Sequence, residues 1–267
     1  MKIAAIQMVS GTALDANLAR ARALLEQARA AGAELAALPE YFCLMGERED
    51  AKLACAETPG QGPIQAMLAA AARELGLWVV GGTLPLVADA PGHVRNTCFV
   101  YAPDGAAAAR YDKIHLFRFD NGREQYDEGR VIEAGAAPVG CTAAGLRVGL
   151  SVCYDLRFPE LYRSLGAAAP CDLISVPAAF TYTTGEKHWE LLLRARAVEN
   201  QSYVIAAAQG GRHANGRRTW GHSMIVDPWG EVLACQAEGE GVVVAELDPA
   251  RLAQVRRQLP ALAHRVL

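Results

Sequence analysis

Residues 146–160 read Leu-Arg-Val-Gly-Leu-Ser-Val-Cys-Tyr-Asp-Leu-Arg-Phe-Pro-Glu. Apolar side chains alternate along the first half, as they do in a half-buried β-strand: Leu146, Val148, Leu150 and Val152. Pro159 is typical of the first turn of a helix, so a short helix is predicted near 159–165. Cys153 therefore lies at the turn between a strand and a helix.

Strand and helix patterns alternate along the rest of the chain. Helices are predicted where apolar residues recur every three to four positions, at 14–28, 64–75 and 188–201. Gly76 is suited to cap the second of these helices. Strands are predicted at 2–8, 34–38, 77–84, 96–101, 107–112, 172–176, 202–208, 220–227 and 241–247. The stretch 113–140 has no clean period and is predicted to be a loop with short helical turns, and the chain ends in a basic, proline-containing tail.

This alternation predicts one α/β domain over residues 1–267, of sandwich or layered type. Periodicity alone does not separate that architecture from a doubly wound parallel sheet. The sequence contains no repeat, low-complexity linker or shift of composition that would divide it.

Composition excludes several classes of function. The formal net charge of −3 favours neither nucleic acid nor an anionic membrane as a partner. No apolar run approaches the ~18 residues that span a bilayer, and the first residues turn polar too soon for a signal peptide. The seven cysteines are scattered and never spaced as C-x-x-C, which argues against a disulfide framework or a zinc site and favours a reducing cytoplasm.

Three residues are candidates for catalysis. A cysteine at a strand-to-helix turn, such as Cys153, is expected to be exposed at a sheet edge near a helix N-terminus, which would favour its thiolate. Glu40 ends a strand among aromatic residues, where a carboxyl group is expected to have a raised pKa and to act as a general base. Lys113 lies between apolar residues and is placed to stabilise an oxyanion. Taken singly, each has a simpler interpretation: a buried structural cysteine, a loop acid, and a surface lysine paired with Asp112.

The order and wording of three segments change this balance. Leu38-Pro39-Glu40, residues 111–117 (Tyr-Asp-Lys-Ile-His-Leu-Phe) and residues 152–160 resemble the glutamate, lysine and cysteine motifs of the nitrilase, or carbon–nitrogen hydrolase, superfamily. The resemblance continues through 188–201 and 221–230, so it spans nearly the whole chain.

The resemblance implies a four-layer αββα sandwich that forms a homodimer or a higher homo-oligomer. It implies catalysis by Glu40, Lys113 and Cys153, with a second glutamate between the lysine and cysteine motifs. Glu128 matches that position best, and Glu124 is the alternative close to it in sequence.

The mechanism that this pattern implies has a role for each residue. Glu40 takes the proton of Cys153, whose sulfur attacks an amide carbon, while Lys113 and the backbone N–H of Tyr154 meet the oxyanion. Glu40 then protonates the leaving nitrogen and activates the water that hydrolyses the thioester, and Glu128 holds Lys113 in place. No metal and no organic cofactor is implied.

The wording is most similar to the Nit branch and its deaminated glutathione amidases, through residues 194–199, 206–213 and 221–230. This implies a small amide substrate that carries a carboxylate, such as an α-keto-acid amide. A cation would bind that carboxylate, and the candidates are Arg157, Arg212 and His213. Tyr154, Phe180, Thr181 and Tyr182 are the candidates to line the pocket.

Other functions remain open at this point. Within the same chemistry, the first alternative is an ω-amidase acting on α-ketoglutaramate or α-ketosuccinamate, and nitrile or N-carbamoyl hydrolysis is less similar in wording. Outside it, the chain could be a catalytically silent binding protein, which the intact trio argues against, or a redox sensor that uses only Cys153. His115 suggests a Cys–His–Glu triad, but in the nitrilase pattern the lysine takes that place and His115 is structural.

Overall fold

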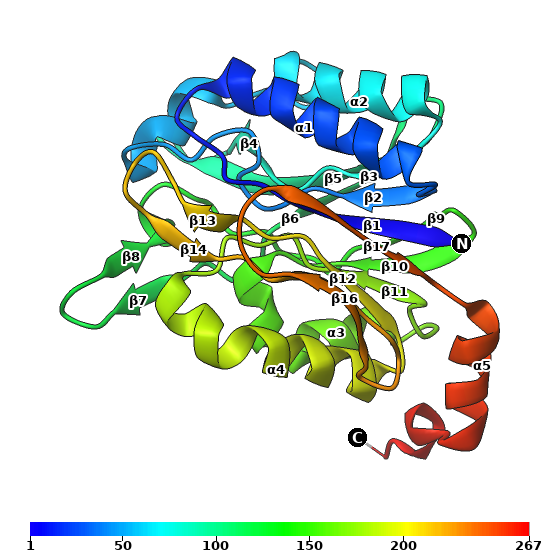
Figure 1. Cartoon of the computed structure of the whole chain (residues 1–267). Helices are drawn as coiled ribbons and strands as arrows, with labels where there is room; N and C mark the ends of the chain where they lie inside the picture. The colour runs from blue at the N-terminus through cyan, green and yellow to red at the C-terminus, as the bar shows by residue number, and fades with distance from the viewer. Residues whose placement is uncertain (267) are drawn as a thin grey trace.

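Two β-sheets pack face to face between two layers of helices (Figure 1). The structure is a computed structural model and describes residues 1–266. One outer layer contains α1 (Leu14–Ala30) and α2 (Pro63–Leu75), and the other contains α3 (Pro159–Leu165) and α4 (Tyr182–Asn200). This confirms the four-layer αββα sandwich and excludes the doubly wound sheet.

The first sheet lies beneath α1 and α2 and has the order β17-β1-β2-β3-β5-β4, with β6 paired to β5. Its strands are β1 (Lys2–Gln7), β2 (Leu35–Ala37), β3 (Trp78–Val80), β4 (Leu84–Val87), β5 (Val94–Tyr101), β6 (Ala107–Asp112) and β17 (Gly241–Glu246). The β1 strand runs parallel to β2, with Ile3 opposite Leu35, and antiparallel to β17.

The second sheet has the order β16-β15-β12-β11-β10-β9. Its strands are β9 (Gly140–Ala143), β10 (Leu146–Leu150), β11 (Leu173–Ser175), β12 (Tyr203–Ala206), β15 (Ser223–Val226) and β16 (Val232–Gln236). Its three central strands, β10, β11 and β12, are parallel, because α3 and α4 make the connections between them.

Strands in the middle of the sandwich are apolar on both faces, which explains why they read as nearly continuous hydrophobic runs. In β1, Ile3 and Ala5 belong to the core between the sheets, whereas Ala4 and Ile6 pack with α1 and α2. Every residue of β1 except Lys2 is buried.

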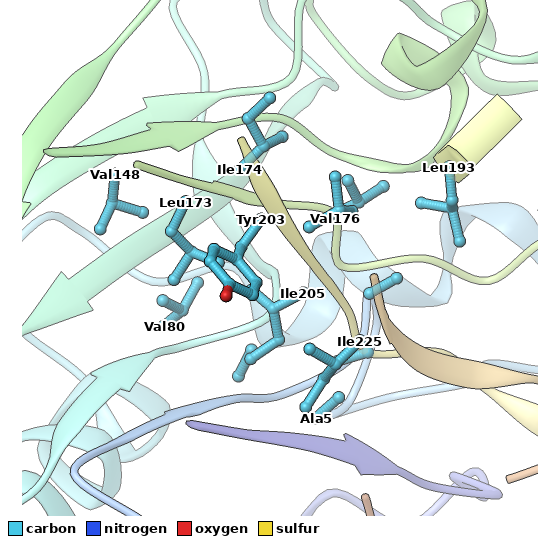
Figure 2. Close-up of a cluster of buried hydrophobic side chains, with 14 of the residues drawn as sticks. Ala5, Val80, Val148, Leu173, Ile174, Val176, Leu193, Tyr203, Ile205 and Ile225 are labelled. Carbon is cyan, nitrogen blue, oxygen red and sulfur yellow. The ribbon is translucent and has the colours of Figure 1, made fainter. Parts of the chain in front are cut away.

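The core between the sheets is shown in Figure 2. Ala5 and Val80 of the first sheet lie beside residues of the second sheet, among them Leu173, Ile205 and Ile225. Side chains alternate along each strand, so Ile174 points to the other face of the second sheet, where the helices lie. These side chains fill the space between the two sheets.

Several short elements were not predicted. Residues 113–140, predicted as a loop with helical turns, contain the hairpin β7 (Arg118–Asp120) to β8 (Gln125–Asp127), and only η2 (Glu128–Arg130) is a helical turn. A second hairpin, β13 (Gly210–Arg212) to β14 (Arg218–Trp220), was also missed. The hairpin strands are mostly polar or glycine, so they show neither an apolar run nor alternation. The strands β9 and β16 were also not predicted. The remaining short turns are η1 (Glu49–Cys55), η3 (Cys153–Arg157) and η4 (Ala261–His264).

One helix begins earlier than predicted and another was not predicted, each for an identifiable reason. The α4 helix begins at Tyr182, six residues early, because the hydroxyl of Thr181 accepts a hydrogen bond from the N–H of Thr184 and caps it. The predicted tail contains α5 (Pro249–Gln258), which begins with an Asp248 cap and a proline in its first turn. Gly76 does cap α2 in the left-handed conformation, with φ of 57°.

No helix within residues 1–266 is both long enough and apolar enough to cross a bilayer.

The inter-sheet core predicts a stability effect. Ile205 is fully buried between the sheets, so Ile205→Ala should lower the free energy of unfolding by about 2–5 kcal/mol, because truncation leaves a cavity. Urea unfolding followed by circular dichroism would measure this. Val87→Ala is the control, since Val87 is 56% exposed, and it should change the free energy of unfolding by less than about 0.5 kcal/mol. Equal effects of the two changes would contradict the assignment of Ile205 to the core.

Candidate active site

Strand ends from both sheets bring Glu40, Lys113 and Cys153 to one place. Glu40 follows β2 by three residues, Lys113 directly follows β6, and Cys153 follows β10 by three residues. Glu40 and Cys153 line the same pocket, and Lys113 is hydrogen-bonded to Glu40. The structure therefore brings together three segments, of which the first and the last are more than a hundred residues apart in the sequence.

The Glu40 carboxylate is buried and accepts three hydrogen bonds. Its Oε1 accepts from Lys113 Nζ and from Asn96 Nδ2, both at 2.9 Å, and its Oε2 accepts from the N–H of Ala179 at 2.9 Å. The backbone before Glu40 is closely packed: a Cβ at Gly82 would lie 2.2 Å from the carbonyl oxygen of Pro39, and φ at Gly82 is +56°. Only glycine allows this approach, which fixes where Glu40 enters the site.

The Lys113 side chain has no exposed surface and bridges two carboxylates. Its Nζ donates to Glu40 at 2.9 Å and to Glu128 at 2.8 and 3.0 Å. Burial disfavours the ammonium ion, but the charges of Glu128 and Glu40 outweigh burial and raise the pKa of Lys113 well above its ordinary value. Asp112 pairs instead with Arg110, so Lys113 is not the surface partner of Asp112.

Glu128, not Glu124, lies beside Lys113. Glu128 begins η2, and its carboxylate also accepts the Tyr41 hydroxyl and the N–H of Phe117, each at 2.7 Å. Burial raises the pKa of Glu128, but Lys113 and Lys52 outweigh burial and lower it overall. Glu124 is half-buried and accepts a hydrogen bond from Thr183 instead.

Cys153 starts η3 with a strained backbone. Its φ is +49°, in a region that L-residues rarely adopt outside functional turns, and its N–H donates to the carbonyl of Pro177 at 2.9 Å. The expectation of an exposed, readily ionised thiol is wrong, because only 8% of the residue is accessible. Burial, together with the negative charge of Glu40, raises the pKa of the Cys153 thiol well above its ordinary value, although Lys113 opposes this.

A buried carboxylate joins the lysine segment to the cysteine turn. Asp155 is fully buried; its Oδ2 accepts from the Tyr111 hydroxyl at 2.7 Å and the N–H of Val152 at 2.8 Å. Its Oδ1 accepts from the N–H of His115 and contacts His115 Nδ1 at 2.7 Å. His115 also stacks on Phe158 with ring centroids 3.7 Å apart. These contacts give His115 the structural position that was predicted for it.

The pocket beside Cys153 is lined by Tyr154, Arg157, Phe180 and Thr181, as predicted, but not by Tyr182, whose ring packs against Trp220. The Arg157 guanidinium lies over the rings of Tyr154 and Phe180, at 5.7 and 5.3 Å. The space left beside the sulfur is only about 10 Å³, roughly enough for one water molecule. Phe117, Ala179, Thr184 and Arg217 also line the pocket and were not predicted.

Two of the predicted cations lie outside this pocket. Arg212 is exposed at the end of β13. His213 is buried, with its ring nitrogens on the Ser10 carbonyl and the Thr219 hydroxyl, at 2.9 and 2.8 Å. The prediction that either lines the pocket is wrong, and the pKa of His213 is lowered by burial. Arg217, from the same hairpin, lines the pocket instead.

The residues that sequence analysis missed reach the site through folding alone. Asn96 comes from β5, Tyr41 follows Glu40, and Arg217 lies just before β14. Tyr41 was the one with a local signal, because it directly follows the candidate base. Nothing in the sequence places Asn96 or Arg217 near Cys153.

Two facing sheets with helices on both sides, and a glutamate, a lysine and a cysteine at their strand ends, match the architecture of enzymes that cleave carbon–nitrogen bonds. The profile of the family described as carbon–nitrogen hydrolase matches residues 2–257. The chain belongs to the carbon–nitrogen hydrolase family and is an enzyme that hydrolyses carbon–nitrogen bonds.

Named relatives and a solved structure cover almost the whole chain. A deaminated glutathione amidase from Synechocystis sp. is 44% identical over 98% of this chain and 97% of its own length. The human omega-amidase NIT2 is 36% identical over 97% of this chain and 92% of its own length. The crystal structure of Nit3 from Saccharomyces cerevisiae superposes with a TM-score of 0.89 at 29% identity, covering 100% of this chain and 97% of that chain. These similarities confirm the resemblance to the Nit branch.

The surroundings of Cys153 predict its titration. Because burial and Glu40 raise the pKa of the thiol, Cys153 should remain protonated at a pH where an ordinary cysteine, with a pKa of 9.0, is already half ionised. The ultraviolet absorbance of the thiolate, measured as the difference between wild type and Cys153→Ala during a pH titration, would locate the midpoint. We expect a midpoint above 9.0. A midpoint below that value would mean that Lys113 outweighs burial and that the resting enzyme already holds a thiolate.

Proposed function

We propose that the chain is an amidase that hydrolyses a small carboxylated amide through a thioester on Cys153, with Glu40 and Lys113 as the other catalytic residues. The observation that supports this most strongly is the buried Lys113 ammonium, bound by Glu40 and Glu128 at the pocket that contains Cys153. A surface lysine and a structural cysteine would need no such arrangement.

In the first half of the proposed reaction, Glu40 takes the proton of Cys153, and the sulfur forms a bond to the amide carbon. The carbonyl π electrons move to oxygen, which is stabilised by the Lys113 ammonium and the N–H of Tyr154. That N–H lies in the first turn of η3, where N–H groups have no acceptor within the helix. Glu40 then gives the proton to the leaving nitrogen, the C–N bond breaks, and the acyl group remains on sulfur as a thioester.

In the second half, Glu40 removes a proton from water, whose oxygen attacks the thioester carbon. The C–S bond breaks, and the sulfur recovers its proton from Glu40 as the carboxylic acid leaves. A thiol that is neutral at rest requires such a base, which agrees with the raised pKa of Cys153. Glu128 holds Lys113 in position through its two hydrogen bonds.

For the substrate, we propose an α-keto-acid amide of the deaminated glutathione type. The name of the Synechocystis relative supports this choice, and the name of the human relative supports an ω-amidase on α-ketoglutaramate or α-ketosuccinamate as the second candidate. Tyr154, Arg157, Phe180 and Thr181 are the proposed contacts of the substrate, since all four line the pocket.

The catalytic assignment predicts a graded loss of activity. Ammonia or amine release would be measured with deaminated glutathione, α-ketoglutaramate, a simple aliphatic amide, an aliphatic nitrile and an N-carbamoyl amino acid. Cys153→Ala should abolish turnover, and Glu40→Gln should lower kcat by about a hundred-fold to ten-thousand-fold because it removes the general base.

Cys235→Ala is the matched control, since Cys235 is exposed and lies outside the pocket, and it should retain the wild-type kcat. Circular dichroism of each variant would establish that it is folded. Turnover by folded Cys153→Ala would rule out the thioester. An enzyme that hydrolyses the nitrile or the N-carbamoyl compound faster than both keto-acid amides would rule out the proposed substrate class.

We also propose that the protein is a homodimer whose subunits meet through the outer face of α4. Leu191, Val198 and Trp229 are 67%, 48% and 53% exposed, which is unusual for large apolar side chains that lie close together. Arg194 donates to the Gly230 carbonyl at 2.8 Å, so α4 and the turn at Trp229 form one surface. A second copy of the chain would cover it.

Sedimentation or light scattering would test the dimer. Wild type should have twice the mass of one chain, and Leu191→Glu should shift it toward the mass of the monomer by placing a charge in the contact. Val87→Glu introduces the same charge at an exposed position on the edge strand β4 and should leave the dimer intact. A monomeric wild type at micromolar concentration would contradict the proposal.

Two further proposals concern the chain as a whole. We propose that residues 1–267 act as one domain, because the family match runs from 2 to 257 and one hydrophobic core joins both sheets. The cytoplasmic location remains a proposal that rests on the scattered spacing of the seven cysteines.

A further inference from the structure

A second cavity lies next to the pocket of Cys153. It has a volume of about 290 Å³, and its walls come from η1, the segment 41–49, Tyr126 and the loop before β14. Arg217 lines both this cavity and the pocket that contains Cys153. Since the space beside the sulfur is only about 10 Å³, most of a bound substrate must be accommodated elsewhere, and this cavity is adjacent.

Two cations in this cavity have no carboxylate partner within residues 1–266. The Arg217 guanidinium lies 5.0 Å from the centre of the Tyr126 ring and donates to the Ala179 carbonyl at 3.2 Å, while its Nε is buried without a hydrogen-bond partner. Lys52 Nζ lies 4.6 Å from the centre of the Tyr41 ring. Among the other partly buried or buried arginines of residues 1–266, Arg95, Arg196 and Arg256 have carboxylate partners, whereas Arg157 has none.

No carboxylate within residues 1–266 forms an ion pair with either of these two cations. Glu47, Arg48 and Glu49 also line the cavity, but all three are exposed at its rim, and Arg48 is paired with Asp50. Burial is the main cause that lowers the pKa of Lys52, and the charges of Glu128 and Glu49 only partly oppose it. Lys52 and Arg217 are both partly buried, and a partly desolvated cation without an ion-pair partner is stabilised when an anion binds to it.

We propose that Lys52 and Arg217 bind the carboxylate of the substrate, so that the 290 Å³ cavity holds the charged end of the molecule while its amide reaches Cys153. This deepens the proposed amidase function and rests on it. Arg217 lines both the pocket of Cys153 and the 290 Å³ cavity. A carboxylate bound to Arg217 in the cavity therefore lies on the side of the pocket that faces Tyr41 and Tyr126. Arg157, which lies over Phe180, is not the carboxylate ligand in this arrangement.

The test separates binding from chemistry by using Cys153→Ala protein, which should not turn over. Isothermal titration calorimetry would compare succinamate, which has one carboxylate and one amide, with succinamide, which has the same carbon skeleton and no charge. Adding Lys52→Met or Arg217→Met should each weaken succinamate binding by about ten-fold or more, because a charge-assisted hydrogen bond is lost. Succinamide binding should change by less than about three-fold, within the context dependence of single contacts.

Two further variants make the result specific. Lys52→Arg keeps the positive charge and should restore most of the binding lost in Lys52→Met. Arg212→Met removes an exposed arginine of the neighbouring strand β13 and should leave succinamate binding unchanged. Thermal unfolding of each variant would show whether it is folded.

Several outcomes would overturn the proposal. They are equal binding of succinamate and succinamide by the Cys153→Ala protein, no loss of binding in Lys52→Met and Arg217→Met, or an equal loss for both ligands. The last result would mean that the two cations position Glu128 rather than bind a carboxylate. The proposed function fails separately, if wild type and Cys153→Ala release ammonia at the same rate.

Discussion

The ammonium of Lys113 is buried between two carboxylates, and a buried charge of this kind is stable only while its partners remain in place. Glu40 reaches Lys113 from the end of β2, and Glu128 reaches it from η2, so the ion cluster joins the first sheet to the segment that follows β6. Two carboxylates and one ammonium leave a net negative charge within the protein. The Lys52 ammonium in the adjacent cavity contributes to lowering the pKa of Glu128, although the two side chains form no ion pair within residues 1–266.

This balance also sets the state of the thiol. Cys153 is buried beside the negative cluster, so its proton is held more firmly than in an ordinary cysteine. A cluster with one more nearby cation would favour the thiolate, as at helix N-termini or beside a histidinium ion. In this protein the carboxylate that disfavours the thiolate is also the group placed to accept the proton, and both effects come from the position of Glu40.

Sequence analysis predicted the layers of the fold and the members of the trio, and it did so for different reasons. Long periodic segments such as α1 and β10 were recognised because their apolar residues recur over many positions. The strands of the β7–β8 and β13–β14 hairpins were missed because their residues are mostly polar or glycine, whereas equally short strands such as β2 and β11 were recognised by their apolar runs. The proximity of Glu40, Lys113 and Cys153 could be inferred only from the resemblance of three motifs, since periodicity says nothing about which strand ends meet.

The surroundings of the trio were less predictable. Asn96 and Arg217 reach the site because β5 lies in the first sheet and because the β13–β14 hairpin folds back over it. The burial of Cys153 was missed because the sequence shows the turn but not the segments that cover it, such as Ala179 and Phe117. Arg212 and His213 were chosen for their charge, but it is Arg217, five residues after Arg212 in the same hairpin, that lines the pocket of Cys153.

Asp155 links the lysine segment, residues 111–117, directly to the turn that contains Cys153. Its carboxylate accepts hydrogen bonds from the Tyr111 hydroxyl and the His115 N–H of the lysine segment and from the Val152 N–H of the cysteine turn. A fluctuation that released Lys113 from its segment would have to leave several of these buried donors without an acceptor, and so would one that opened the turn at Cys153. The two motifs should therefore open together or not at all. A state in which only the Cys153 turn has opened is then rare, so the thiol is seldom exposed to oxidants while Lys113 and Glu40 remain in place.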